Sequence, residues 1–159
     1  DLDMRTVNFD MAQAEFNLAK SLSVKDYIAR APLGTGTADN TGKGVLNVYG
    51  TFKPFNAFFY GCTLQDGATL DLSAQTGAWS TTSTGTCPTK TVTFAKDAVI
   101  TIDLGSRADA GDKGKIVAWT EKPADIDTVT FNPSKNTKGR IEVCDDGIYL
   151  RRGLTLFLR

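Results

Sequence analysis

The sequence contains no histidine, and this absence removes several kinds of catalytic and metal-binding site. Neither a Ser-His-Asp nor a Cys-His nucleophile can be assembled without an imidazole base. The three cysteines, Cys62, Cys87 and Cys144, are scattered and form no CxxC pair, so they offer too few ligands for the common structural zinc sites. No glycine-rich stretch precedes the Lys-Ser/Thr pair of a phosphate-binding loop. We therefore expect a protein that is not an enzyme and that has no cofactor and no bound metal.

Net charge is also lacking, because 18 Lys and Arg residues balance 18 Asp and Glu residues. A neutral chain has no general electrostatic attraction for nucleic acid or for an anionic membrane. No apolar run approaches the roughly 20 residues that a membrane helix needs. We expect neither nucleic acid binding nor membrane insertion, whereas low net charge leaves self-association open.

What the sequence does contain is alternation of apolar and polar residues with a period of two. Such segments predict short half-buried strands, and Gly, Asn and Asp between them predict turns. The clearest alternating sets are Leu46 and Val48; Leu70 and Leu72; Ile100, Ile102 and Leu104; Ile116 and Ala118; Val129 and Phe131; Ile141 and Val143; and Ile148 and Leu150. Turns are expected at Asp66-Gly67 and at Asp145-Asp146-Gly147. The pattern indicates an all-β fold.

Two segments near the N-terminus are open to a helical interpretation. Residues 12–20 contain good helix formers, and residues 24–31 could form one helical turn. We interpret both as strand-and-turn units because the sequence on each side alternates. A pilin-like N-terminal helix is the competing interpretation.

A short stretch of sequence occurs twice. Residues 64–72 (LQDGATLDL) align with residues 94–102 (FAKDAVITI), thirty positions further on, and residues 9–18 form a weaker third copy. Self-similarity at such a period is typical of stacked-repeat folds, in which each unit buries its core against its neighbours. We expect a right-handed parallel β-helix, a solenoid of short coils. An antiparallel β-sandwich or jelly roll is the alternative, because alternation does not distinguish parallel from antiparallel strands.

The chain is expected to form a single domain over residues 1–159. Polar segments at 34–43 and 75–90 are interpreted as loop insertions. A C-terminal strand at 153–159 would either cap the last coil or pair with another chain through Leu154, Leu156 and Leu158. The flanking arginines favour the cap, because charged residues beside an exposed edge oppose aggregation.

Taken together, the units at 44–54, 64–73 and 91–104 resemble autotransporter-associated β-strand repeats, with GATLDL at 67–72 as the closest match. The resemblance covers residues 5–151, and the chain looks like the C-terminal segment of a longer solenoid. It implies a right-handed parallel β-helix of a bacterial surface protein, exported as a passenger or stalk. It also implies an extracellular or cell-surface location and no catalytic signature.

Aromatic residues are the candidates for contact with a partner. Trp79 lies in the 75–90 insertion and is expected to be exposed, and Phe58, Phe59 and Tyr60 could form a binding patch or pack internally. Trp119 lies in a predicted strand and is expected to be structural.

The cysteines allow two interpretations. All three could be small buried residues. Alternatively, a Cys62–Cys87 disulfide could close the Thr-, Ser- and Gly-rich segment between them, which would indicate an oxidising compartment.

Clustered acidic residues suggest a different kind of function. Asp97, Asp103, Asp109 and Asp112 are interspersed with Arg107, Lys113 and Lys115, as a β-helix enzyme acting on acidic polysaccharide would require. Solvated turns between coils are the simpler interpretation. Asp71 and Asp103 follow Leu70 and Ile102 in the same way, which predicts a repeated turn-capping role rather than an acid–base pair.

These observations favour a non-catalytic structural or adhesive module of a cell-surface or secreted protein. Its loops would contact a host or environmental glycan or a surface protein. The alternatives are a subunit of a self-assembling extracellular filament and a β-helix polysaccharide lyase or hydrolase.

Overall fold

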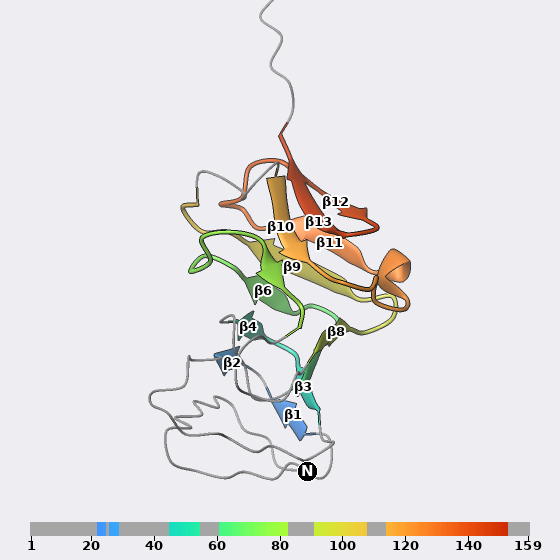
Figure 1. The fold of residues 1–159 in the computed structure, drawn as a ribbon. Helices are drawn as coiled ribbons and strands as arrows, with labels where there is room; N and C mark the ends of the chain where they lie inside the picture. Colours follow the sequence, from blue (N-terminus) through green and yellow to red (C-terminus); the bar gives the residue numbers. More distant parts are fainter. Residues whose placement is uncertain are drawn as a thin grey trace, which may run out of the picture.

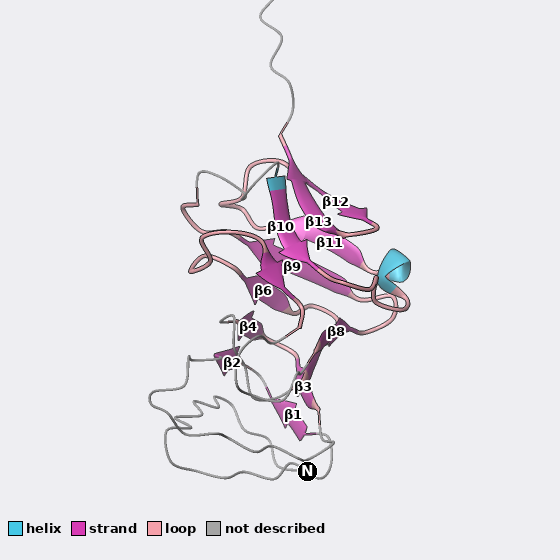
Figure 2. Ribbon diagram, viewed as in Figure 1, coloured by secondary structure: helices cyan, strands magenta, loops and turns pink. Residues whose placement is uncertain are grey.

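The computed structural model describes residues 22–24, 26–28, 45–54, 61–82, 91–107 and 114–152, and these form an all-β structure with parallel sheets (Figures 1 and 2). A single-turn 3-10 helix, η2, spans Ile126–Thr128. The strands are β1 (Leu22–Val24), β2 (Tyr27–Ile28), β3 (Leu46–Val48), β4 (Thr51–Lys53), β5 (Cys62–Leu64), β6 (Thr69–Asp71), β7 (Trp79–Ser80), β8 (Val92–Phe94), β9 (Val99–Asp103), β10 (Lys115–Ala118), β11 (Thr130–Pro133), β12 (Arg140–Cys144) and β13 (Gly147–Arg151).

Apart from β12 and β13, strands that follow one another in sequence belong to different sheets. The first sheet has the order β1-β3-β5-β8, the second has β11-β9-β6-β4-β2, and the third has β12-β13-β10-β7. The chain thus passes through the three sheets as β5, β6, β7 and again as β8, β9, β10. Every pair of neighbours in the first two sheets is parallel. The alternative of an antiparallel sandwich is therefore wrong for these sheets.

The thirty-residue repeat is confirmed in the first sheet and is shifted in the second. Leu64 pairs with Phe94, thirty positions away, but Leu70 pairs with Ile102 rather than with Ile100. The shift arises because β9 has five residues and β6 has three. A shift of two residues keeps each side chain on the same face, so the apolar residues still point inward.

Corresponding turns precede these two strands. The amide of Ala68 donates to the carbonyl of Gln65 and that of Ala98 to Ala95, and the third residue of each turn has a positive φ, 81° at Gly67 and 59° at Asp97. Glycine and aspartate are among the few residues that tolerate this conformation. The turn predicted at Asp66-Gly67 is confirmed.

The core lies between the sheets and is almost entirely aliphatic and aromatic. Phe52 is fully buried, stacks on Tyr27 with ring centroids 5.3 Å apart and meets the edge of Trp79 at 5.8 Å. The expectation that Trp79 is exposed in an insertion is therefore wrong. Residues 75–82 turn back into the molecule and form β7, which pairs with β10, so Trp79 is a core residue.

β13 forms a hairpin with β12 and pairs antiparallel with β10 (Figure 1). The turn predicted at Asp145 and Asp146 is confirmed, because Cys144 pairs with Gly147 on either side of it. A register shift interrupts β10 between Lys115 and Val117. Ile116 and Val117 are consequently both buried, and the prediction that Ile116 and Ala118 share an inward face is wrong.

The carboxylates of Asp71 and Asp103 end β6 and β9 in the same way. Asp71 Oδ1 accepts from the amide of Ser73, and Asp103 Oδ1 accepts from the amide of Gly105, each at 2.9 Å. The predicted turn-capping role of both residues is confirmed. Asp71 also lies 3.1 Å from Lys53 Nζ, which joins it to the neighbouring strand β4.

Some expectations concern parts of the chain outside the described residues. These are the loop at 34–43, the weaker repeat copy at 9–18, and the C-terminal strand 153–159 with Leu154, Leu156 and Leu158. Within the described segments, no helix is long and apolar enough to cross a membrane.

Candidate functional site

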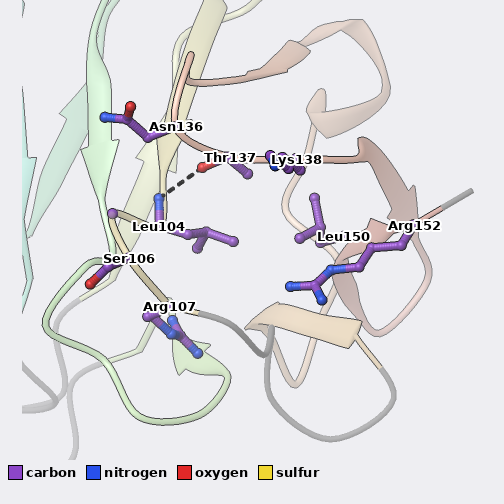
Figure 3. A pocket seen from close by; sticks show the side chains of 9 residues that line it. Leu104, Ser106, Arg107, Asn136, Thr137, Lys138, Leu150 and Arg152 are labelled. Atoms are coloured by element: carbon purple, nitrogen blue, oxygen red, sulfur yellow. Dashed lines mark hydrogen bonds between the residues drawn. The ribbon is translucent and has the colours of Figure 1, made fainter.

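A pocket of about 320 Å³ opens at the corner where the second sheet meets the hairpin (Figure 3). Its walls come from the turn after β9, the turn after β11 and the end of β13. These segments are far apart in sequence, and the stacking of β9 on β11 brings the two turns together.

Asp103 and Thr137 fix the two turns against each other. Besides capping its own turn, Asp103 Oδ1 accepts a 2.8 Å hydrogen bond from Ser134 Oγ. The amide of Leu104 donates to Thr137 Oγ1 at 3.1 Å (Figure 3). Thr137 is buried, so this hydrogen bond is shielded from water and holds the wall of the pocket in place.

Three cationic side chains line the pocket. Arg107 comes from the turn after β9, Lys138 precedes β12, and Arg152 follows β13. In Figure 3 the side chain of Arg152 extends toward the middle of the pocket, and Arg107 lies on the side of the β9 turn. None of the described residues that line the pocket is acidic.

The guanidinium of Arg107 is held by main-chain oxygens. Its Nη1 donates to the carbonyl of Leu72 at 3.3 Å, and its Nη2 donates to the carbonyl of Gly77 at 3.1 Å. These two hydrogen bonds to main-chain oxygens fix the orientation of the planar guanidinium. Arg107 is thus positioned before any ligand arrives.

The remaining lining combines apolar and uncharged polar groups. Leu104 and Leu150 are buried and face the pocket from opposite walls (Figure 3). Ser106 and Asn136 are exposed at its edge and offer a hydroxyl and an amide. This arrangement suits a small ligand with an apolar face, hydroxyl groups and a negatively charged oxygen pair, which arginine binds in bidentate geometry.

A second pocket, of about 490 Å³, lies between β8 and the segment that follows β10. Half of its described lining residues are threonines, namely Thr81, Thr82, Thr91, Thr93 and Thr120. Its two charged residues are opposite in sign, Glu121 and Lys122, and Lys122 pairs with Asp127 at 2.8 Å. The charges in this pocket therefore offset each other, whereas the described charges in the pocket beside Arg107 are all positive.

No aromatic contact candidate is among the described residues that line the pocket beside Arg107. Trp79 is in the core, whereas Phe58, Phe59 and Tyr60 lie outside the described residues. Trp119 is buried, and its Nε1 donates to the carbonyl of Asp145 at 2.7 Å, which confirms its structural role.

Cys62 is fully buried in the core beside the first sheet, and no disulfide joins it to Cys144, the other cysteine among the described residues. Burial raises the pKa of this thiol well above its usual range, so it is a poor nucleophile. Cys87 lies outside the described residues, and the disulfide between the two stays a prediction.

The described members of the charged cluster predicted from the sequence have separate surroundings. Asp103 is committed to the turns described above, and Asp97 is exposed in the turn before β9. Asp109, Asp112 and Lys113 lie outside the described residues. Lys115 forms an ion pair with Asp146 instead of facing the pocket. Across the described ranges, no three His, Cys, Asp or Glu side chains are grouped to hold a metal ion.

Sequence reasoning identified Arg107 within the charged cluster but missed Lys138 and Arg152. Lys138 lies 31 positions after Arg107, which is the offset at which β9 pairs with β11, so continuing the repeat by one more coil could have found it. Arg152 reaches the pocket only because β13 runs antiparallel to β10, and nothing in the repeat indicates that reversal.

Comparison with protein-family models, with curated proteins and with solved structures finds no match to this chain. The resemblance to autotransporter-associated repeats therefore remains a prediction.

Proposed function

We propose that this chain is a non-catalytic structural and adhesive module of a bacterial cell-surface or secreted protein, built as a right-handed parallel β-helix. The observation that carries the proposal is the repeated order of strands through three sheets, with parallel pairing in the first two. In a β-helix each coil contributes one strand to each sheet, and a right-handed crossover is the strongly preferred hand for parallel strands.

The use of polar side chains supports a structural role. Outward-facing Thr63 and Thr93 lie on paired strands of the first sheet, with their hydroxyl oxygens 3.0 Å apart. On the second sheet, Lys53 and Asp71 join β4 to β6, and Asp103 and Ser134 join β9 to β11. Such bonds between successive coils give a rigid support for surface loops and pockets.

The self-assembling filament is the less favoured alternative. β12 is one of the two edge strands of the third sheet as described, and β7 is the other. Arg140 and Glu142 on β12 are charged and partly exposed. Charged residues on an edge strand oppose pairing with another chain.

The proposal predicts binding without turnover. Fluorescently labelled protein would be titrated with a panel of neutral and acidic polysaccharides, while reducing ends and unsaturated products are monitored in the same samples. Saturable binding with unchanged polysaccharide is expected. Release of shortened or unsaturated chains would make the protein a lyase or hydrolase. If no polysaccharide of the panel bound, the result would count against adhesion of this protein to glycans.

Light scattering over a concentration series tests the filament alternative. A constant molecular mass is expected with and without reductant. Growth to large species that persists in reductant would favour assembly through strand edges.

A further inference from the structure

We propose that the pocket lined by Arg107, Lys138 and Arg152 binds an acidic saccharide unit, one sugar ring bearing a carboxylate or a sulfate. The inference rests on the proposed adhesive function and specifies the ligand class and the residues that bind it.

Charge is the first argument. The molecule as a whole is neutral, yet three cationic side chains from three separate segments converge on one pocket whose described lining has no carboxylate. Among the described residues, no carboxylate forms an ion pair with Lys138. A concave site of one charge sign attracts ligands of the opposite sign more strongly than a flat surface does.

Preorganisation is the second argument. Arg107 is oriented by the carbonyls of Leu72 and Gly77, and the turn that bears it is fixed through Asp103 and Thr137. A cation that is already ordered loses less conformational entropy when it binds an oxyanion. An exposed lysine without such support would give weaker and less selective binding.

Shape and polarity identify the ligand as a saccharide. The volume of about 320 Å³ is at the lower end of the range for small-molecule pockets. Leu104 and Leu150, which are 2 % and 5 % exposed, form an apolar floor behind a bound ring, whereas Ser106 and Asn136 at the edge can exchange hydrogen bonds with its hydroxyls. A bare inorganic anion would fill only part of this volume.

The test compares matched polymers and matched variants. Binding of the whole chain to polygalacturonate, dextran sulfate and uncharged dextran would be measured by biolayer interferometry at about 0.1 M salt, where electrostatic interactions are moderately screened. Lys138→Gln combined with Arg152→Gln removes two pocket charges. Lys135→Gln is the single-charge control for Lys138→Gln, because Lys135 is exposed in the same turn but does not line the pocket.

We expect at least one acidic polymer to bind and dextran not to bind. The double variant should lose about tenfold or more in affinity, and Lys138→Gln alone should lose more than Lys135→Gln, which should stay within about twofold of the unmodified protein. Preference for polygalacturonate would identify the group as a carboxylate, and preference for dextran sulfate would identify it as a sulfate ester. A far-ultraviolet circular dichroism spectrum and a melting curve for each variant would show that the fold is retained.

Other outcomes separate the two proposals. Equal losses for Lys135→Gln and Lys138→Gln, or unchanged binding by the double variant, would overturn the pocket assignment while leaving an adhesive function standing. Binding to neutral glycans alone would do the same. Pocket-dependent binding followed by cleavage of the polymer would retain the site but overturn the non-catalytic function.

Discussion

The first two sheets form a parallel stack, and strands β12 and β13 form a C-terminal hairpin. These two regions are stabilised in different ways. In the stack, side-chain bonds join residues about one coil apart, such as Thr63 and Thr93 or Asp103 and Ser134, which are separated by 30 and 31 positions. In the hairpin, Arg151 bonds to Glu142 nine positions away, and Tyr149 bonds to Asp146 three positions away. The stack thus depends on long-range repetition, and the hairpin depends largely on local contacts.

Burial differs between the stack and the outer strand of the hairpin, whereas Ile148 and Leu150 of β13 are buried like the stack residues. Leu46, Leu70 and Ile102 in the stack are at most 1 % exposed, whereas Ile141 and Val143 of β12 are only partly buried. Exposed ion pairs contribute little to stability. We conclude that the stack contributes most of the buried apolar side chains among the described residues, and that the hairpin completes the pocket.

The largest expected effect is on the stack. Phe52→Ala removes a ring that contacts both Tyr27 and Trp79 in the core, so the free energy of unfolding should fall by about 3–5 kcal/mol. Tyr49→Ala is the control, because Tyr49 is 54 % exposed just before β4, and it should change stability by less than about 0.5 kcal/mol. Urea unfolding measures both, and equal effects would contradict the assignment of the core.

The next effect concerns the junction of hairpin and stack. A methyl group on Gly147 would lie 2.1 Å from the carbonyl oxygen of Val117, so Gly147→Ala must displace β13 from β10. We expect a loss of about 1–3 kcal/mol, typical of overpacking. Hydrogen exchange should accelerate most in β12 and β13.

Gly77→Ala is the control for this substitution, because a methyl group there would meet no atom within 4 Å. It should leave stability and exchange nearly unchanged. Uniformly faster exchange in Gly147→Ala, with no preference for the hairpin, would contradict the separation of the two regions.

A smaller effect is expected at the turn that supports the pocket. Asp103→Ala removes the acceptor for the amide of Gly105 and for Ser134 Oγ, and should cost about 1–2 kcal/mol. Ser134→Ala removes only the second of these bonds and should cost less. Thermal melts of both variants provide the test, and a larger loss for Ser134→Ala would show that the carboxylate is not the organising group.

The smallest effect is a dependence on pH at Asp71. Burial raises the pKa of this carboxyl. Hydrogen bonds from Ser73 and Lys53, together with the charge of Lys53, lower the pKa by more than burial raises it, so the pKa lies below its usual range. Its contribution to stability is therefore present above the unfolded-state pKa of about 3.9 and is lost as the pH falls through the folded-state value.

When the pH is lowered to about 2, Asp71→Asn should therefore lose less stability than the unmodified protein, and the two curves should diverge only below the unfolded-state pKa of about 3.9. Urea unfolding at each pH measures this difference. Parallel stability curves for the two proteins would show that the ion pair with Lys53 has no net effect.

The sequence predicted what repetition and alternation encode. The similar sequences around Leu64 and Phe94 predict that these two residues pair. The similar positions of Asp71 and Asp103 after Leu70 and Ile102 predict the same capping role for both. The two-residue extension of β9 escaped prediction because it preserves the inward face, and a periodic pattern does not detect it.

Trp79 was misplaced for a different reason. Its polar neighbours resemble a surface loop, yet two residues of β7 suffice to pair with β10 and to bury the indole against Phe52. The pocket was beyond sequence reasoning, because the antiparallel return of β13, which positions Arg152, is decided by tertiary packing.

The most direct test of the account is the pattern of strand pairing in solution, measured by nuclear Overhauser contacts on isotopically labelled protein. We predict parallel contacts that join Asn47 to Thr63 and Thr63 to Thr93, and contacts that place Thr69 beside Thr101. Close Hα–Hα pairs between these strands, as antiparallel pairing produces, would contradict the parallel stack on which the proposed function depends.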